Sequence, residues 1–423
     1  MKYLLFFTIV FFNLEANDRI TYAEGSNNNC SVKFEELVFD GLNTHPSIEM
    51  SRETIKAAEF EVDIAQWGYF PSPSIDYSVK SGEKNNIVTR LDQPIWTGGK
   101  IDSAYDKAVA MKKEASHELS ENRYKLIDNY VDALKQYLKT KNKIKALNHN
   151  KSKFYDLSQM LDRFIKAGEL SLTDKNLLNS RIASLSSDLI ITKSKHKVAL
   201  IQLEILTGKK INCKIDFHPQ DMLPTQINVD KLVSDLQEYH PTLKMMDAKI
   251  LAAISEVDNA KSKMWPSLVL RAEHTKGTIY DESNPETETL IYLNLNISTG
   301  AGLSGLSNID KAKIDISRTK FEKSTKLKEL LDQLMVDYTN YITSVSHTQM
   351  ILNDIEVAQN IFESNKRLFL SQKKSWLDLV NSLSELNKQK IKYVELLIDK
   401  NILEYKIALK TGKVNLETLE VAF

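Results

Sequence analysis

The sequence predicts a mainly α-helical chain with four β-strands, built as two copies of one unit. Three observations predict this. Ile87, Thr89 and Leu91 alternate with more polar residues, and after Gly99 the apolar residues are spaced by threes and fours. These are the side-chain periods of a strand and of a helix. The helical pattern runs to about residue 165 without Pro or Gly, and the same landmarks return about 200 residues later.

The composition agrees with long helices and gives no sign of a polyanionic partner. The 423 residues include 56 basic and 56 acidic ones, so we expect no nucleic-acid partner. Only 13 glycines and 9 prolines occur, which favours long helices joined by few loops.

The N-terminus predicts a signal peptide over residues 1–23. Lys2 precedes an almost wholly apolar stretch over residues 3–14, and Thr21-Tyr22-Ala23 offers small residues for cleavage. The alternative, a buried N-terminal helix, is disfavoured by the polar run over residues 24–29. No later run of apolar residues is long enough for a membrane-spanning helix, so insertion would require a closed barrel.

Residues 24–212 are predicted to form the first unit. Helices are expected over 34–42 and from about 44 to 67, followed by strands over 74–81 and 86–93. A helical hairpin is expected over 101–207, with its tip at residues 167–171. At 1.5 Å per residue its first helix would be roughly 95 Å long.

The second unit, residues 228–423, repeats these landmarks in the same order after a linker over 213–227. His45-Pro46 returns as His240-Pro241, and Thr207-Gly208 returns as Thr411-Gly412. Strands are expected over 267–276 and 288–298, and a helical hairpin over 306–411. Such ordered repetition predicts a duplicated helix-strand-strand-long helix-helix unit.

Four strands cannot close a barrel alone, because about eight are the practical minimum. Other chains must therefore complete it, and three copies would supply twelve strands.

These features resemble the TolC family of outer-membrane efflux proteins over essentially the whole chain after the signal. Gln93 to Gly99 match the family's Gln-Pro-apolar-x-x-Gly-Gly motif before a long helix, His-Pro opens each unit, and Arg163 to Gly168 match the first tip. The resemblance implies a homotrimer, with a twelve-stranded barrel in the outer membrane continued by a twelve-helix α-barrel in the periplasm. The Trp-Thr-Gly-Gly form at residues 96–99 is more similar to type I secretion components.

The resemblance also implies roles for both ends of the helices. Asp378, Asn381 and Asp174 would surround the periplasmic aperture, although for Asp378 a plain helix-start carboxylate is an equal alternative. The second tip lacks the family's usual glycine. Residues at the two tips would contact an adaptor protein: Ala167, Gly168, Glu169, Leu170, Ser171, Leu370, Ser371, Gln372, Lys373 and Trp376.

Other motifs receive structural interpretations. Gly300-x-Gly302-x-x-Gly305 matches a dinucleotide fingerprint, but the compact βαβ unit that such sites need is absent from the pattern. We assign Pro94, Gly98, Gly99, Gly300 and Gly302 to the barrel-to-helix transitions. Residues near them predict either an aromatic girdle or simple packing: Trp67, Tyr69, Phe70, Trp96 and Trp265. No metal, cofactor or catalytic motif is expected.

The two cysteines, Cys30 and Cys213, flank the helices of the first unit. An oxidising periplasm favours a disulfide. The sequence does not give the distance between the two cysteines in space, so two free thiols stay an alternative.

The predicted function is an outer-membrane export duct, most similar to type I protein secretion. An inner-membrane transporter, of the ABC type by resemblance, would recruit it through a periplasmic adaptor. One alternative is a multidrug or other small-molecule efflux duct. Another is a periplasmic helical-hairpin adaptor without a pore, which the four strands and the duplication disfavour.

Overall fold

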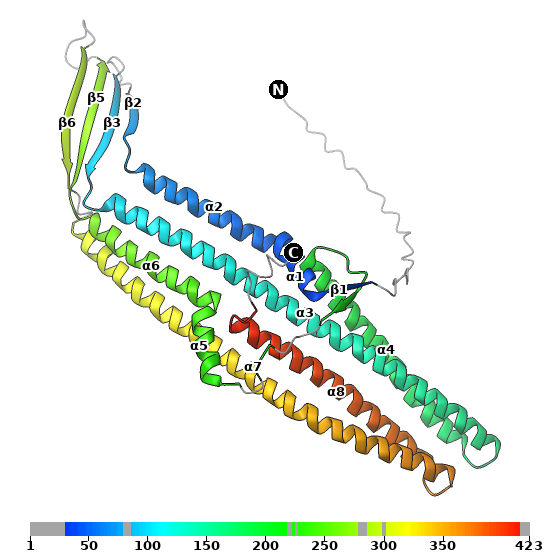
Figure 1. Cartoon of the computed structure of the whole chain (residues 1–423). Coiled ribbons are helices and arrows are strands. Elements are labelled where there is room, and N and C mark those ends of the chain that lie inside the picture. The colour runs from blue at the N-terminus through cyan, green and yellow to red at the C-terminus, as the bar shows by residue number, and fades with distance from the viewer. Residues whose placement is uncertain are drawn as a thin grey trace, which may run out of the picture.

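The molecule is elongated, with a β-sheet at one end and the tips of two helical hairpins at the other (Figure 1). The computed structural model describes residues 30–78, 86–217, 222–224, 227–277, 286–297 and 302–414. The predicted signal peptide lies outside the described residues. Among the described residues, no helix combines the length and the apolar character needed to cross a membrane.

The two halves of the chain have the same order of elements. The first half contains β1 (Ser31–Lys33), α1 (Phe34–Thr44), α2 (Pro46–Trp67), β2 (Ser72–Ser78), β3 (Asn86–Trp96), α3 (Lys100–Lys166) and α4 (Leu172–Thr207). The second contains β4 (Lys214–Asp216), α5 (Val229–Tyr239), α6 (Pro241–Ser262), β5 (Ser267–Gly277), β6 (Glu286–Asn296), α7 (Ser304–Leu370) and α8 (Trp376–Lys410). The longest helices, α3 and α7, have 67 residues each.

Several element bounds differ from those predicted. The strand expected over 86–93 continues to Trp96, because a register shift between Pro94 and Trp96 accommodates a proline that has no N–H to donate. The strands expected over 74–81 and 288–298 begin two residues earlier, at Ser72 and Glu286. The expected linker 213–227 contains β4, which pairs with β1.

A His-Pro dipeptide starts the long helix that leads to each strand pair. The Nδ1 atoms of His45 and His240 each accept the backbone N–H two residues on, at 3.3 Å in both cases. Each ring thereby satisfies a donor that the first helical turn leaves unpaired, while the following proline needs none. Burial lowers the pKa of His240 to about 4, which keeps its ring neutral.

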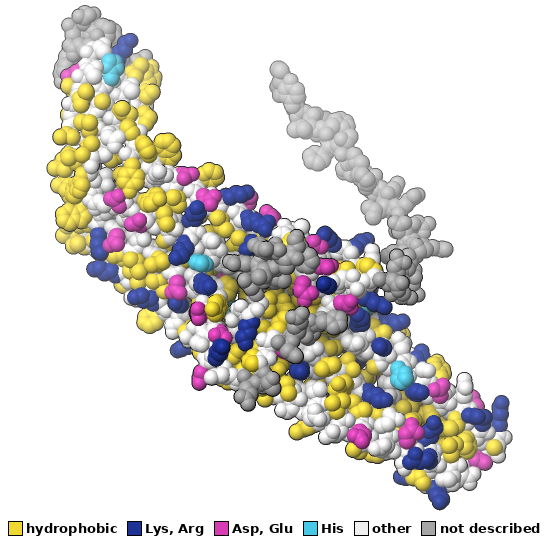
Figure 2. Space-filling model, in the orientation of Figure 1, with side chains coloured by type: hydrophobic (Ala, Val, Ile, Leu, Met, Phe, Trp, Pro, Cys, Tyr) yellow, Lys and Arg dark blue, Asp and Glu magenta, His cyan; other side chains and the backbone are white. Residues whose placement is uncertain are grey.

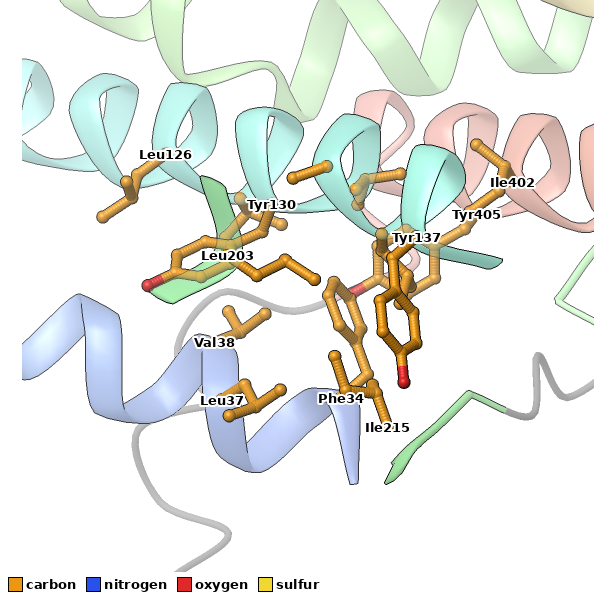
Figure 3. Close-up of a cluster of buried hydrophobic side chains, with 14 of the residues drawn as sticks. Phe34, Leu37, Val38, Leu126, Tyr130, Tyr137, Leu203, Ile215, Ile402 and Tyr405 are labelled. Atoms are coloured by element: carbon orange, nitrogen blue, oxygen red, sulfur yellow. The ribbon is translucent and has the colours of Figure 1, made fainter. Parts of the chain in front are cut away.

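The largest hydrophobic core lies midway along the molecule, where α1 meets α3, α4 and α8 (Figure 3). Tyr130 of α3 and Phe34 of α1 are completely buried there. Gly41 allows this packing, since a Cβ at that position would lie 1.7 Å from the Tyr130 hydroxyl oxygen. The short helix α1 therefore packs closely against the middle of the long helix α3 and against α4.

Ion pairs also line part of the α3–α8 boundary, beside the hydrophobic core. Asp399 of α8 lies 3.0 Å from the Nζ atom of Lys135 and 2.7 Å from that of Lys139. Lys406 lies 2.8 Å from Asp132 and 3.1 Å from Asp128. These pairs join the two hairpins over residues 128–139 of α3.

A disulfide closes the first half of the chain. Cys30 and Cys213 are bonded, with their Cα atoms 4.9 Å apart and a sequence separation of 183. The parallel pairing of β1 with β4 holds them together, and the Lys214 N–H donates to the Cys30 carbonyl at 3.1 Å.

We predict that replacing both cysteines by serine lowers the free energy of unfolding by about 2–5 kcal/mol, because a bridge over so long a loop restricts the unfolded chain. Thermal unfolding in detergent measures this change. Thiol labelling of the unreduced, unfolded wild-type protein is the direct check, with a reduced sample as control. Two reactive thiols per chain before reduction would contradict the bridge.

Candidate functional site

The sheet at one end of the molecule contains strands from both halves of the chain. Its order is β2-β3-β5-β6, and every neighbouring pair is antiparallel. The only contact between the halves inside this sheet is the β3–β5 pair. Strands β2 and β6 have one unpaired edge each in the single chain, so the sheet is open on both sides.

One face of this sheet is apolar and exposed. Because side chains alternate across a strand, the register places Ile75, Tyr77, Ile291, Leu293 and Leu295 on the same face. Ile75 and Ile291 are each 73% exposed. The space-filling view shows hydrophobic side chains gathered over these strands (Figure 2). A continuous exposed apolar face of this kind marks an interaction surface.

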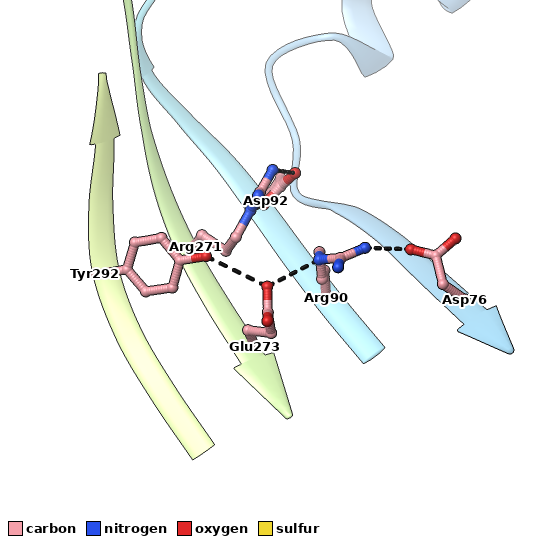
Figure 4. A network of polar contacts seen from close by, with 6 residues as sticks. All are labelled: Asp76, Arg90, Asp92, Arg271, Glu273 and Tyr292. Atoms are coloured by element: carbon pink, nitrogen blue, oxygen red, sulfur yellow. Dashed lines mark hydrogen bonds and ion pairs between the residues drawn. The ribbon is translucent and has the colours of Figure 1, made fainter. Parts of the chain in front are cut away.

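The other face of the sheet carries a network of charges (Figure 4). Arg271 donates from Nε and Nη2 to the two carboxylate oxygens of Asp92, at 2.7 and 2.8 Å. Arg90 donates from Nε to Glu273 at 2.8 Å and also contacts Asp76 on β2. Tyr292 on β6 donates its hydroxyl to Glu273 at 3.3 Å. The network thus links all four strands.

The charged pairs favour one register between the two halves. Arg90 lies directly opposite Glu273, and Asp92 lies directly opposite Arg271. Only slips by an even number of residues keep the apolar face intact. A slip of two residues in one direction would place Arg90 opposite Arg271, and a slip in the other direction would place Asp92 opposite Glu273. Both alternatives oppose like charges, which destabilises a cross-strand pair.

We predict that Arg271→Asp lowers the unfolding temperature in detergent, because it places two carboxylates opposite each other. Adding Asp92→Arg restores an attractive pair, and the double-mutant cycle should give a coupling energy of about 1 kcal/mol. Lys276→Glu, on the opposite face of β5, is the matched charge-reversal control. A double variant no more stable than the Arg271→Asp variant would refute the pairing argument.

Glycines form the turns between sheet and helix. Gly98 and Gly99 have φ values of +62° and +84°, and Gly302, before α7, has a φ of +61°. Only glycine adopts such angles readily. At Gly98 a Cβ would also lie 2.3 Å from the Cβ of Trp265, so this turn of the first half packs against the second half. Gly300 lies outside the described residues.

The structure also places the tryptophans near these turns and the glycine motif at residues 300–305. Trp67 and Trp265, at the ends of α2 and α6, are largely exposed. No described strand follows α7, which leaves the glycine motif at 300–305 without the βαβ unit of a dinucleotide site. In the described part of the chain, no cluster of His, Cys, Asp or Glu has the geometry of a metal site.

The first tip, between α3 and α4, is held by a reciprocal cap. The Asp174 N–H donates to Ser171 Oγ at 3.3 Å, and Asp174 Oδ2 accepts the Ser171 N–H at 3.1 Å. Gly168 turns the chain with a φ of +78°. Among the predicted contact residues, Ala167, Gly168, Glu169 and Ser171 are exposed and Leu170 is half-buried.

The second tip, between α7 and α8, turns at Gln372, which has a φ of +59° where a glycine would be expected. Leu370, Ser371, Gln372 and Lys373 are exposed. Trp376 is only 2% exposed and packs against Phe369, with ring centroids 5.4 Å apart. Its assignment to the adaptor-contact surface is therefore corrected, because this indole belongs to the core of the tip.

Asp378 caps the start of α8. Its carboxylate accepts the Ser375 hydroxyl at 2.8 Å, and its N–H donates to Ser375 Oγ at 3.2 Å. The hydrogen bond from Ser375, followed by the charge of Lys374 at 3.8 Å, lowers the pKa of Asp378. Asn381, three residues on, is exposed. In the single chain, Asp174 and Asp378 thus have equivalent capping roles at separate tips.

Comparisons with known proteins identify the fold. No family model matches the chain, and no curated protein does. Solved structures do match. CusC covers 90% of this chain with a TM-score of 0.77 and 12% identity, over 92% of its own length. VceC from Vibrio cholerae (TM-score 0.76, 14% identity) and CmeC from Campylobacter jejuni (0.74, 14%) also cover 90% of this chain, over 96% and 86% of their own lengths.

VceC is described as an outer-membrane protein, and CmeC as an outer-membrane channel. Each match covers 90% of this chain. The chain therefore has the fold of the TolC-like outer-membrane channels.

Proposed function

We propose that this protein is an outer-membrane channel, formed by three copies whose sheets close a twelve-stranded barrel and whose helices continue it into the periplasm. The observation that carries the proposal is the sheet with one exposed apolar face, one charged face and two unpaired edges. In lipid every backbone donor needs a partner, and closing the barrel supplies partners for both edges. Alternating side chains then face lipid outside and water inside.

The position of the hairpin tips, at the opposite end of the molecule from the sheet, supports the proposed partners. The tips lie far from the sheet (Figure 1), so a channel held in the outer membrane would present them to a periplasmic adaptor and an inner-membrane transporter. By its resemblance to type I secretion components, the Trp-Thr-Gly-Gly motif at residues 96–99 favours protein export over small-molecule efflux. An adaptor without a pore is less consistent with the fold, since it would leave the apolar face of the sheet without a function.

Fractionation and conductance test this function. We expect the protein in the outer-membrane fraction, as a trimer after extraction in detergent, and we expect it to form discrete channels in planar lipid bilayers. The matched control is Ile75→Asp with Ile291→Asp, which places charges on the apolar face and should prevent insertion. Recovery of the wild-type protein as a soluble periplasmic monomer would refute the proposal.

A second prediction concerns the aperture that three copies of α8 would form. Three Asp378 carboxylates near a narrow mouth would attract cations, and Asn381 would add dipoles without charge. We expect Asp378→Asn to reduce the permeability of K⁺ relative to Cl⁻ and to weaken block by multivalent cations. Reversal potentials of single channels measure this. Asp230→Asn, at the start of α5, is the control, and unchanged selectivity in Asp378→Asn would leave that carboxylate with its capping role alone.

A further inference from the structure

The His-Pro starts of α2 and α6 are equivalent in sequence but lie in different surroundings. His240 is 1% exposed, whereas the ring of His45 is partly exposed and also contacts the Ser47 hydroxyl at 2.7 Å. Helix α8 begins at residue 376 and α4 at residue 172, so Lys410 at the end of α8 corresponds to Leu206 of α4. The second half thus combines a buried histidine with a buried lysine, and the first half does not.

The end of α8 meets the start of α6 beside α7 (Figure 1). A Cβ at Gly412, just after α8, would lie 2.7 Å from the Cβ of Tyr239, the residue before His240. Lys410 is 6% exposed, and its Nζ atom donates to Asp337 of α7 at 2.6 Å. Residues 239–242 and 410–412 therefore form one contact, which we call the α6–α8 joint.

The imidazole of His240 suits this joint only while it is neutral. Its Nδ1 accepts the Thr242 N–H, which assigns the ring proton to Nε2. The Nε2 atom is buried without a hydrogen-bond partner among the described residues, and the ring packs against Tyr124 of α3 with centroids 4.7 Å apart. Protonation would make Nδ1 a second donor facing the Thr242 N–H, so the cap at the start of α6 would be lost.

The carboxylates at this joint already neutralise other cations. Asp337 pairs with Lys410 at 2.6 Å, and Glu121 of α3 pairs with Lys125 at 2.9 Å. An imidazolium at His240 would therefore add a second cation beside Lys410 without gaining a free carboxylate. Like charges in a buried place repel strongly, because little water screens them.

The titration of His240 agrees with this geometry. Burial, followed by the charge of Lys410, lowers the pKa of His240 from 6.5 to about 4. Burial also raises the pKa of Tyr124, which stays uncharged, and Glu238 of α5 is exposed to solvent. In an opened joint the ring would regain its ordinary pKa and bind a proton more tightly. As the pH falls from 6.5 towards 4, acid therefore favours the opened form.

We propose that His240 makes the α6–α8 joint a proton-sensitive contact, in which protonation of the ring breaks the cap of α6, repels Lys410 and frees the end of α8. Acid would thus loosen the second half of the chain selectively. The first half has a partly exposed histidine, no lysine at the equivalent of Lys410, and the Cys30–Cys213 bridge. The joint lies within one chain, so this inference does not depend on the proposed channel.

Reporter thiols at equivalent positions of the two halves test the proposal. Ile407 of α8 corresponds to Leu203 of α4, and both are 0% exposed. Full-length Ile407→Cys and Leu203→Cys variants, each with the native disulfide intact, are labelled in detergent with dithiodipyridine, which reacts with thiols in acid. Each rate is divided by that of the unfolded variant at the same pH. Between about pH 7 and about pH 4.5 we expect this relative rate to rise at least about tenfold for Ile407→Cys, because opening takes up a proton, and far less for Leu203→Cys.

Three further variants, made in the Ile407→Cys background, identify the group that titrates. His240→Asn keeps an acceptor for the cap but takes up no proton in this range, so the rise should disappear. His45→Asn makes the same change in the first half and should leave the rise unchanged. Lys410→Leu with Asp337→Ala gives the joint the apolar residues of the equivalent first-half positions. It should reduce the rise, because the folded ring then loses a neighbouring cation.

Thermal unfolding followed by circular dichroism supplies a second measurement without a reporter thiol. We expect the unfolding temperature to fall more between about pH 7 and about pH 4.5 in the wild-type protein than in His240→Asn. The proposal is overturned if both reporter thiols respond equally to acid, if His240→Asn retains the rise, or if the unfolding temperatures of the wild-type protein and His240→Asn depend equally on pH.

Discussion

The pairing of β3 with β5 is the contact on which the architecture depends, because it is where the sheet strands of the two halves meet. Its register determines which side chains share a face, and a slip by one residue would exchange the apolar and charged faces. Arg90–Glu273 and Asp92–Arg271 lie directly across this pair. Gly98 packs against Trp265 where the same two strands continue toward the helices. Charge, backbone hydrogen bonds and steric fit therefore favour the same alignment.

Beyond the sheet, the two hairpins are joined by different forces at different levels. Near the middle, the side chains of the core around Tyr130 and Phe34 are buried. At the tips, Phe164, Phe369 and Trp376 form a second apolar cluster. Beside the first cluster, Lys135 and Lys139 contact Asp399 across the α3–α8 boundary. Partly exposed ion pairs contribute little stability and are screened by salt, so the apolar clusters contribute most of the stability of this boundary.

Sequence patterns predicted the elements whose ends are determined by local chemistry. These ends depend on residues that are neighbours in the sequence. Examples are the His-Pro starts of α2 and α6, the glycine that ends α4, and the change from strand to helix spacing before α3. The sequence patterns failed where tertiary contacts decide. Pro94 reads as a strand end but lies within β3 at a register shift, and β4 forms in the expected linker because β1 is available to pair with it.

The side-chain sites show the same limit. Ser375 and Asp378 have the spacing of a helix cap, and a cap is what they form. The resemblance assigns Trp376 to the adaptor-contact surface of the second tip, whereas the structure buries it in the apolar cluster of that tip, against Phe369. The burial of His240 had no signal in the sequence at all. It arises from the packing of helices that lie far apart along the chain.

The positions of the cysteines have a consequence for the order of assembly. Cys30 and Cys213 are the only two cysteines in the chain, and they bracket the first half. Both partners are therefore present as soon as the chain has emerged through residue 213, before β5, β6 and the second hairpin exist. No later thiol can compete for either of them, so oxidation has a single intramolecular product. The first half can thus be covalently closed while the second is still being delivered, which offers β5 a preformed β3 edge on which to pair.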